Sequence, residues 1–230
     1  EFKNISKYFP GVKALDNICF KAYGGEVLAF LGENGAGKST LLKVLNGDYQ
    51  PTNGEYLLDG VQKHFSSPHE AIQEGISVIY QERQILLELS VAENIYLGRM
   101  PSKKFGIIDK SKANQMAQKI IDDFGLPISP TTKVKDLSIA YQQMVEIMKA
   151  YSRENLKVIC FDEPTASLSD AEIDSLFEVI AKLKAQGKII IYVSHRMKEI
   201  QQIADKVAIF KDGHYVDTVI TKEVPEQQLI

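Results

Sequence analysis

Short continuous apolar runs alternate with longer amphipathic stretches along much of the chain. We expect strands at Ile18 to Ala22, Val27 to Leu31, Glu55 to Leu58, Ile76 to Tyr80, Val158 to Phe161, Ile189 to Val193 and Val207 to Phe210. Apolar positions at helical spacing predict helices over Ser111 to Phe124, Ile139 to Tyr151 and Ala171 to Ala185. Strands that alternate with helices indicate an α/β fold, with a mostly parallel sheet covered by helices on both faces.

Two regions depart from this alternation. Near the N-terminus, strand signals follow one another, and Asn53-Gly54 and Asp59-Gly60 are hairpin-turn signals, which indicates an antiparallel β-subdomain. From Leu87 to Asn155 the periodicity is helical, with a proline-containing connector at Gly125 to Pro130. We therefore expect a core formed by residues 1–86 and 156–230, and an inserted α-helical subdomain at residues 87–155.

Composition narrows the class of protein. The 230 residues are 44% hydrophobic, which is enough for a sizeable core. No apolar run approaches the roughly 20 residues of a bilayer-spanning helix. With 27 basic and 30 acidic residues, the chain has no net field that would draw it to nucleic acid or to an anionic membrane. The N-terminus lacks a secretory signal, and we expect Cys19 and Cys160 to be reduced core thiols in strands, so a cytosolic environment is favoured.

The segment after the strand at Val27 to Leu31 matches G-x-x-x-x-G-K-[ST] at every fixed position. It consists of Gly32, Glu33, Asn34, Gly35, Ala36, Gly37, Lys38, Ser39 and Thr40. Between a strand and a helix this pattern predicts a phosphate-binding loop, because glycines let backbone N–H groups point at phosphate oxygens and the helix dipole favours an anion. Lys38 would reach the β- and γ-phosphates, and Ser39 would bind the Mg²⁺ that bridges them. The chain is therefore expected to bind a nucleoside triphosphate.

Two carboxylates follow the apolar strand at Val158 to Phe161. In folds with such a loop, a magnesium-binding acid lies at this kind of strand end, so we assign Asp162 to the metal. Glu163 leaves the strand in another direction and is the candidate for acting on the water that attacks the γ-phosphate. A solvated acidic turn is the plainer alternative for this pair.

Two further polar residues close strands at the same expected edge of the sheet. Gln81 follows the strand at Ile76 to Tyr80, where its amide could touch Mg²⁺ or the attacking water, although a loop glutamine is often structural. His195 follows the strand at Ile189 to Val193 and is the candidate contact to the γ-phosphate, although a lone histidine at a strand end is often structural too. The remaining histidines are expected at the surface.

The order of these motifs resembles the nucleotide-binding cassette of ABC transporters over nearly the whole chain. The segments that carry the resemblance are Gly32 to Thr40, Gln81, Leu137-Ser138 ahead of a helix, Asp162 to Thr165 and Ser194-His195. Commoner phosphate-loop ATPases and GTPases have nothing like Leu137-Ser138 at this place. The resemblance implies a RecA-like P-loop NTPase fold, ATP and Mg²⁺ as cofactors, and ATP hydrolysis. It also implies a head-to-tail dimer in which Ser138 reaches the γ-phosphate held by the partner cassette.

The match has two departures. The usual Leu-Ser-Gly-Gly-Gln reads Leu137-Ser138-Ile139-Ala140-Tyr141 here, and Ser169 stands where an Asp commonly ends the loop after the acidic strand. Both departures resemble the first cassette of bacterial sugar-importer ATPases, as do residues 9–15, 93–99 and 142–147. Those proteins carry two cassettes on one polypeptide. We therefore expect an N-terminal cassette followed by a linker from Val224-Pro225, with a naturally single cassette as the alternative.

The same resemblance implies further contacts. Phe9 would stack on adenine, with Tyr8 as the neighbouring alternative and packing within the β-subdomain as the plainer role. The segment from Glu82 to Leu89 would meet the coupling helix of a membrane subunit, although Ile85-Leu86-Leu87 could instead be core. The expected partners are a second cassette in the same chain or a homodimer, membrane-spanning permease subunits and, indirectly, a periplasmic or extracellular solute-binding protein. No nucleic-acid partner is expected, and the chain would lie at the cytoplasmic side of the cell membrane as a peripheral subunit.

The leading hypothesis is an ATPase subunit that energises uptake of a monosaccharide or related small solute. Its catalytic residues would be Lys38, Gln81, Glu163 and His195. One alternative is a soluble ABC-type ATPase that acts on a nucleic-acid machine, against which the charge balance weighs. The other is a nucleotide-sensing module without turnover, against which the presence of Glu163 and His195 weighs.

Overall fold

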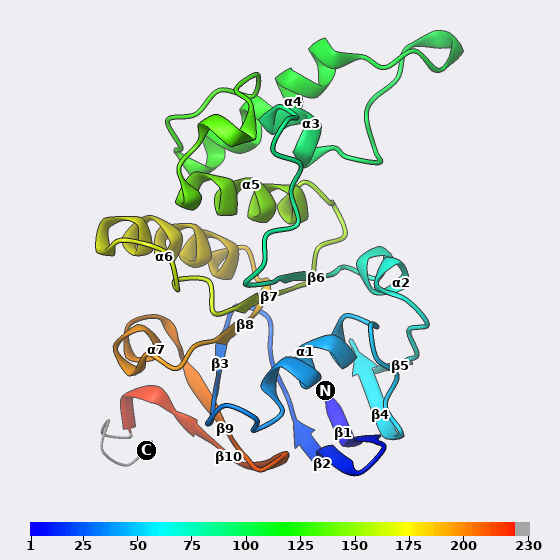
Figure 1. The fold of residues 1–230 in the computed structure, drawn as a ribbon, viewed down its shortest axis with the longest axis vertical. Helices are drawn as coiled ribbons and strands as arrows, with labels where there is room; N and C mark the ends of the chain where they lie inside the picture. Colours follow the sequence, from blue (N-terminus) through cyan, green and yellow to red (C-terminus); the bar gives the residue numbers. More distant parts are fainter. Residues whose placement is uncertain (224–230) are drawn as a thin grey trace. The chain divides into compact units, whose positions relative to one another are not determined.

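The computed structural model describes residues 1–223 and separates into two compact units (Figure 1). The first unit comprises Glu1–Val78, Asn155–Pro164 and the chain from Ile180 onward, and the second comprises Ile79–Glu154 and Thr165–Val179. The first unit is built on two sheets, whereas the second is helical. The linker expected from Val224-Pro225 lies outside the described residues.

The larger sheet has the strand order β10-β9-β3-β8-β7-β6. Its strands are β3 (Val27–Leu31), β6 (Ile76–Ile79), β7 (Val158–Asp162), β8 (Ile189–Val193), β9 (Lys206–Lys211) and β10 (His214–Ile220). β3 pairs in parallel with β8 and β9, and β7 pairs in parallel with β8. Every residue of β3 is buried, as in strands covered on both faces. The predicted mostly parallel sheet is confirmed, and β10 adds an antiparallel edge strand beside β9 that the apolar pattern did not identify.

The smaller sheet is antiparallel, with the strand order β2-β1-β4-β5. Its strands are β1 (Phe2–Phe9), β2 (Val12–Phe20), β4 (Asn53–Leu58) and β5 (Val61–Lys63). The hairpin turn predicted at Asp59-Gly60 is confirmed, with positive φ angles of 52° and 76°. The turn predicted at Asn53-Gly54 is wrong, because both residues lie within β4, where Asn53 pairs with Ser6 of β1. A β-carbon on Gly54 would collide with the backbone of Asn4, so this glycine permits close strand approach.

Aromatic side chains fill the core of the first unit. The ring centroid of Phe20 in β2 lies 5.3 Å from that of Phe30 in β3, and Phe30 lies 5.0 Å from Phe210 in β9. All three are buried, and both pairs are edge-to-face, which stabilises aromatic pairs beyond the burial of their area. The helices described in this unit are α1 (Lys38–Leu45), α2 (Pro68–Gln73), α7 (Met197–Ile203), the short 3₁₀ helix η3 (Thr221–Glu223) and the end of α6 (Asp170–Ala185) from Ile180 onward.

The second unit is helical, but its bounds differ from those predicted for the insertion, because it begins at Ile79, ends its first stretch at Glu154 and also includes Thr165–Val179. It contains α3 (Val91–Ile95), α4 (Lys110–Phe124), α5 (Ile139–Tyr151), the 3₁₀ helices η1 (Lys104–Gly106) and η2 (Val134–Asp136), and the first part of α6 (Asp170–Ala185). The predicted bounds of α5 are confirmed, and α4 and α6 each begin one residue before their predicted starts. α4 ends where Gly125 takes a φ of 70°, the left-handed conformation that commonly terminates a helix.

The two cysteines are free thiols in different environments. Cys160 in β7 is fully buried, and burial raises the pKa of its thiol far above the usual value. The expectation of a core thiol is wrong for Cys19, which is exposed in β2 and exchanges hydrogen bonds with Asn4. Buried and exposed positions alternate toward the end of β2, and a one-residue shift in register exchanges the two faces.

Candidate functional site

The predicted phosphate-binding loop connects β3 to α1 in the first unit. Leu31 ends the strand and Lys38 begins the helix, so residues 32–37 form the connection. Gly35 and Gly37 have φ angles of 89° and 98°, which other residues rarely adopt. A β-carbon on Gly37 would also lie 2.7 Å from the carbonyl oxygen of Ala14. The conformation of the loop therefore requires glycine at these positions.

The first turn of α1 has no side-chain cap. Gly37 is its N-cap residue and makes no capping hydrogen bond from a side chain. The helical ladder starts with the N–H of Leu41, which donates to the carbonyl oxygen of Gly37 at 2.8 Å. The preceding N–H groups, on Lys38, Ser39 and Thr40, are those that a helix leaves for an outside acceptor. Together with the helix dipole, they form a site suited to an anion.

Lys38 is held by carbonyl groups of its own loop. Its side-chain Nζ donates to the carbonyl oxygen of Gly32 at 2.6 Å and to that of Glu33 at 2.9 Å, and the residue is only 7% exposed. Burial lowers the pKa of its ammonium group, while the charges of Glu163 and Asp162 act in the opposite direction. The loop therefore fixes a cation beside the open amides of α1, as phosphate binding requires.

The two predicted acids lie at the C-terminal end of β7. Asp162 is the last residue of the strand and pairs with Val193 of β8. Glu163 follows with a φ of 47°, a costly conformation for a residue with a side chain, and its N–H donates to the carbonyl oxygen of Val193 at 2.9 Å. Burial raises the pKa of the Asp162 carboxyl, as does the charge of Glu163, while Lys38 opposes both. Backbone strain and perturbed titration at one strand end are typical of functional sites.

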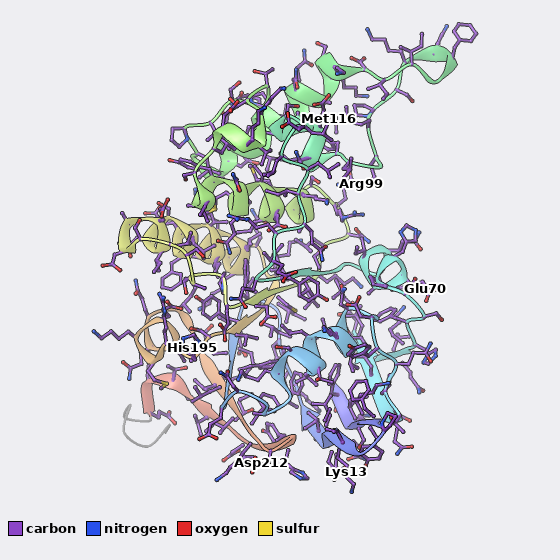
Figure 2. The ribbon with its side chains drawn as sticks, in the orientation of Figure 1. Lys13, Glu70, Arg99, Met116, His195 and Asp212 are labelled. Carbon is purple, nitrogen blue, oxygen red and sulfur yellow. The ribbon has the colours of Figure 1, made fainter. Side chains whose placement is uncertain are left out.

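His195 contacts Glu163 directly. Nδ1 of His195 lies 3.2 Å from Oε1 of Glu163. The histidine side chain, labelled in Figure 2, is 63% exposed, whereas that of Glu163 is 24% exposed. The structure thus brings together the residue assigned to the attacking water and the residue assigned to the γ-phosphate. The other histidines are exposed, as expected: His64, His69 and His214.

A buried acid that the sequence motifs did not single out supports the segment around His195. Glu199 of α7 is 6% exposed and accepts hydrogen bonds from the hydroxyls of Tyr192, at 3.0 Å, and Ser194, at 2.9 Å. Arg196 forms an ion pair with Glu199 at 3.2 Å, and its backbone N–H donates to the Ser194 hydroxyl. Glu199 thereby fixes both neighbours of His195. Its sequence signal is weak, because an acid in the first turn of a helix is common.

The donor atoms of this unit fit a Mg²⁺ ion that is bound together with a phosphate group. Within residues 1–223, no cluster of three or more His, Cys, Asp or Glu side chains could hold a metal. Ser39 and Asp162 offer a hydroxyl and a carboxylate oxygen, the hard donors that Mg²⁺ prefers. Because Mg²⁺ commonly takes its other ligands from water and substrate phosphates, so small a donor set suits a metal that arrives with a nucleotide.

Two predicted site residues, Ser138 and Gln81, belong to the second unit. Ser138 is the N-cap of α5, where its hydroxyl oxygen accepts the N–H of Tyr141 at 3.4 Å. The same hydroxyl donates to Glu172 at 3.4 Å, and Glu172 also accepts hydrogen bonds from the backbone and side chain of Ser169. Gln81 is exposed and follows β6. The roles of Ser138 toward a nucleotide and of Gln81 toward a metal stay predictions.

Phe9, the predicted adenine contact, is half-buried at the end of β1. Its ring packs edge-on against Tyr49 with the centroids 5.4 Å apart, and Nζ of Lys7 lies 5.1 Å from its centroid. The hydroxyl of neighbouring Tyr8 donates to Asp16 at 2.9 Å. The role of Phe9 toward adenine stays a prediction.

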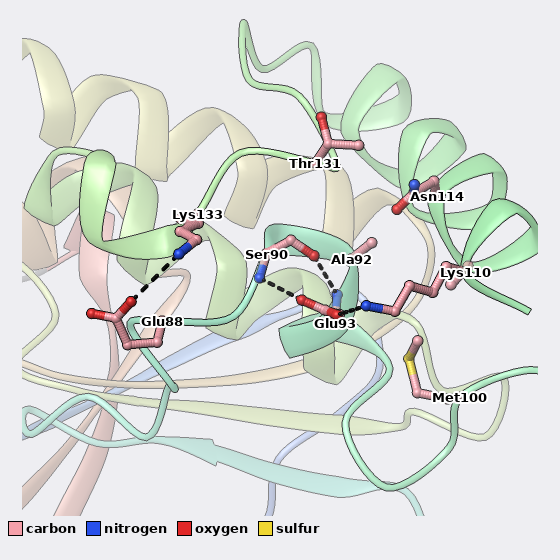
Figure 3. Close-up of a pocket in the computed structure, with 10 residues that line it drawn as sticks. Glu88, Ser90, Ala92, Glu93, Met100, Lys110, Asn114, Thr131 and Lys133 are labelled. Carbon is pink, nitrogen blue, oxygen red and sulfur yellow. Dashed lines mark hydrogen bonds and ion pairs between the residues drawn. The ribbon is translucent and has the colours of Figure 1, made fainter. Parts of the chain in front are cut away.

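A cavity of about 260 Å³ in the second unit is lined by none of the predicted site residues (Figure 3). Around it, Lys110 pairs with Glu93 at 2.9 Å and Lys133 pairs with Glu88 at 3.6 Å. Ser90 and Glu93 form a capping box at the start of α3, and the backbone hydrogen bond from Ser90 is the main reason that the pKa of Glu93 falls to about 2. These charged side chains pair with one another, and those of the capping box stabilise the start of α3.

Known proteins resemble the chain in sequence and in fold. Residues 15–166 match the family model described as ABC transporter. The chain is 53% identical over 218 residues to the arabinose import ATP-binding protein AraG of Mannheimia succiniciproducens, and 54% identical over 218 residues to that of Vibrio parahaemolyticus. Each alignment covers 95% of this chain and 43% of the relative, so the chain spans less than half the length of these curated relatives.

The fold is similar to the crystal structure of a nucleotide-free ATP-binding cassette from an ABC transporter. The TM-score is 0.84 at 28% identity, and the match covers 95% of this chain and 90% of that chain. Among the described residues, no helix is both long enough and apolar enough to cross a membrane. Since the family model matches more than half of the sequence, the chain belongs to the ABC transporter family.

Proposed function

We propose that the chain is an ATP-binding and ATP-hydrolysing cassette that energises import of a monosaccharide or related small solute. The observation that carries this proposal is the uncapped start of α1 beside the buried Lys38 ammonium group. The names of the arabinose import relatives favour a sugar as the solute. Because those relatives are more than twice as long as this chain, we propose that it acts as one cassette of a pair, in the same chain or as a homodimer.

Phosphate binding would rest on the loop between β3 and α1. Residues 32–40, with the amides of the first turn of α1, would surround the phosphates, and Lys38 would supply a positive charge close to them. The carbonyl groups of Gly32 and Glu33 already hold Nζ of Lys38 in the structure. Phe9 would stack on the adenine ring, with Lys7 close to the same aromatic face.

Ser39 and Asp162, together with Gln81, would hold Mg²⁺ through a hydroxyl, a carboxylate and an amide oxygen. When bound, the ion would neutralise charge on the phosphate oxygens. Burial and the neighbouring Glu163 both raise the pKa of Asp162, so a cation beside this carboxyl would favour its charged form.

Proton handling would rest on Glu163 and His195. The 3.2 Å contact between them lets one group orient the other, and the strained backbone of Glu163 fixes where its carboxylate leaves the strand. The hydrogen bonds of Glu199 to the segment around His195 would limit its motion. Glu163 would accept a proton from the attacking water, and the His195 ring would contact the γ-phosphate.

Ser138 would act in trans on the nucleotide of the second cassette. Its hydroxyl and the first amides of α5 are donors at a helix start, and α5 keeps this cap although both family glycines are replaced by Ile139 and Ala140. Glu172 accepts hydrogen bonds from the hydroxyls of Ser138 and Ser169 within the second unit, which supports a fixed position for the Ser138 side chain.

The segment from Glu82 to Leu89 would contact a membrane-spanning permease subunit. Leu86 and Leu87 are 50% and 48% exposed, which supports a partner contact over burial in the core of the unit. We further propose that the chain works at the cytoplasmic side of the cell membrane, that a solute-binding protein supplies the solute indirectly, and that no nucleic acid takes part.

Replacing Glu163 tests the proposed activity. We expect Glu163→Gln to bind ATP with unchanged affinity and to hydrolyse it about 100-fold more slowly or worse, because the group that accepts the proton is lost. Static light scattering with ATP and without Mg²⁺ should then show a dimer that is absent without nucleotide.

Glu178→Gln is the matched control, since Glu178 is an exposed acid on α6 outside the site. Wild-type hydrolysis by Glu163→Gln would refute the assigned role, and a wild-type chain that binds no ATP would refute the proposed function itself.

A further inference from the structure

The segment that joins β6 to α3 has no regular secondary structure over most of its length, yet side chains from two helices hold its backbone. All of these residues belong to the second unit. The segment includes Gln84 and Leu86, the two residues whose main chain receives most of these contacts. An irregular segment can be well ordered when neighbouring side chains supply the hydrogen bonds that a helix or sheet would otherwise give its backbone.

Two side chains of α5 hold both main-chain polar groups of Gln84. The carboxylate of Glu146 accepts a hydrogen bond from the N–H of Gln84. Nζ of Lys149 donates to the carbonyl oxygen of Gln84 at 3.3 Å. Glu146 and Lys149 lie one helical turn apart on α5, so they face the same side of the helix. Together they tie one residue of the segment to α5.

Asn94 of α3 holds Leu86 in a similar way. Its Oδ1 accepts the N–H of Leu86 at 2.8 Å, and its Nδ2 donates to the carbonyl oxygen of Leu86 at 2.9 Å. Asn94 is fully buried, and its Nδ2 also donates to the carbonyl oxygens of Leu89 and Ser90. Because the side-chain amide of Asn94 both accepts from and donates to the main chain of Leu86, as a paired strand would, it restricts the conformation of this part of the segment.

The fixed backbone presents apolar side chains outward. Leu86 and Leu87 are about half exposed although their main chain is anchored from within the unit. A surface whose backbone is already ordered loses less entropy on docking than a mobile loop. The anchors therefore favour binding of a partner at these two leucines.

Anchoring the segment through Glu146 costs free energy, because a carboxylate is removed from water. Glu146 is only 5% exposed, and in the part of the chain that the structure describes its Oε2 has no hydrogen-bond partner. Burial raises its pKa to about 7, although the hydrogen bond from the Gln84 N–H and the charges of Lys149 and Arg83 act in the opposite direction. Burial and the charges of Arg153 and Arg99 (Arg99 is labelled in Figure 2) in turn lower the pKa of Lys149. A neutral amide at this position would accept the same N–H at lower cost, so the anchor needs an acceptor and not a charge.

We infer that Glu146 and Lys149 are positioning residues that tie the segment from Glu82 to Leu89 to α5, so that Leu86 and Leu87 move with the helix that Ser138 begins. This inference rests on the proposed function, in which Ser138 meets nucleotide and the segment meets a membrane subunit. Motion at the start of α5 then reaches the membrane partner through the main chain of Gln84.

Amide hydrogen exchange measures directly whether Glu146 protects the N–H of Gln84. We expect the Gln84 amide to exchange roughly tenfold faster in Glu146→Ala than in wild type, because a hydrogen bond to a charged acceptor is lost. Glu146→Gln keeps an acceptor and should restore protection. In wild type, protection relative to the intrinsic rate should change as pH passes through about 7, whereas in Glu146→Gln it should not. Asp174→Ala, at an exposed acid of α6, is the control, and the amides of α5 report whether each variant is folded.

Uptake of labelled arabinose by the full-length protein, assembled with its membrane subunits, measures the consequence. Glu146→Ala should lower ATP-driven uptake while ATP affinity and basal hydrolysis stay at wild-type values, and Glu146→Gln should restore uptake. Unchanged exchange at Gln84, or unchanged uptake, in Glu146→Ala would overturn the inference. Absence of ATP binding in wild type would instead overturn the proposed function, and the exchange data would still test the contact of Glu146 with Gln84.

Discussion

The two helices on which the proposed site depends begin in opposite ways. α1 begins at Gly37 with no side-chain cap, whereas α5 begins at Ser138, whose hydroxyl oxygen accepts the N–H of Tyr141. The start of α1 carries the buried Lys38, and the start of α5 is supported by Glu172. A helix start with a side-chain cap is stable without a ligand, and one that leaves its amides open beside a fixed cation is suited to bind an anion.

The open start of α1 costs the unliganded fold stability. With Gly37 at the N-cap, the missing side-chain cap costs only about 0.3 kcal/mol, and the glycines of the loop add conformational freedom to the unfolded chain. The preference for a side-chain cap is not met at the start of α1 and is met at the start of α5. A missing cap is expected where a bound ligand accepts the hydrogen bonds of the open amides.

The largest effect is expected from a β-carbon on Gly37. Its φ of 98° and the approach of the Ala14 carbonyl oxygen to 2.7 Å leave no room for a side chain. We expect Gly37→Ala to lower the free energy of unfolding by about 3 kcal/mol and to abolish ATP binding, since strain and steric overlap add. Urea unfolding and nucleotide titration measure the two effects.

Gly106→Ala is the matched control, because Gly106 has a φ of 74° and open space around it. It shares the conformational strain without the overlap, so we expect a loss of about 1 kcal/mol and unchanged ATP affinity. Equal losses in the two variants would show that packing around Gly37 is not what requires glycine.

Removing the fixed cation should weaken ATP binding about 100-fold, because charge-assisted hydrogen bonds to phosphate are lost. The change is Lys38→Ala, and isothermal titration with ATP measures it. Lys119→Ala, at an exposed position of α4, should bind ATP as wild type does. Wild-type ATP affinity in Lys38→Ala would contradict the assignment of this loop as the phosphate-binding site.

Glu146 predicts a pH dependence in the second unit. Its pKa is about 7 in the folded chain, against an ordinary value of 4.5, so the folded state resists ionisation and loses stability as pH rises from about 4.5 to 7. Glu146→Gln removes this titration. We expect the variant to gain about 2 kcal/mol of stability over wild type between pH 5 and pH 8. Parallel stability curves for the two proteins would contradict the raised pKa.

The smallest effect is expected at the capped helix. Ser138→Ala removes an N-cap whose hydrogen bond to Tyr141 is long, at 3.4 Å, so we expect a loss of about 0.5 to 1 kcal/mol in urea unfolding. ATP affinity of the monomeric chain should be unchanged. A drop in affinity comparable to that of Lys38→Ala would mean that Ser138 acts in cis.

Local patterns predicted much of the first unit and the three long helices α4, α5 and α6, but not α3. The β3 run and the bounds of α5 depend on apolar periodicity and capping residues that lie within one segment. The phosphate loop could be predicted because its glycines, Lys38 and Ser39 are consecutive. The placement of Glu163 and His195 at one sheet edge followed from the rule that parallel strands bring their carboxyl ends together, although their direct contact was not predicted.

Supporting residues could not be predicted, because their partners are distant in the chain. Glu146 holds Gln84 and Glu199 holds Tyr192, and in a sequence both acids look like ordinary helix surface positions. Asn53-Gly54 carries a turn signal, but pairing of β4 with β1 decides its conformation. Exposure of Cys19 depends in the same way on the register of β2, which a single strand does not encode.

The most direct test of the account is the amide NMR spectrum of the nitrogen-labelled chain during titration with ATP and Mg²⁺, with AMP as the control ligand. We expect ATP to shift the amide resonances of residues 35–40, because phosphates accept from the open amides of α1, and AMP to leave them largely unchanged. The amides of residues 139–141, at the capped start of α5, should stay in place in the monomer. ATP binding that leaves residues 35–40 unmoved would contradict the claim that the uncapped helix start is the phosphate site.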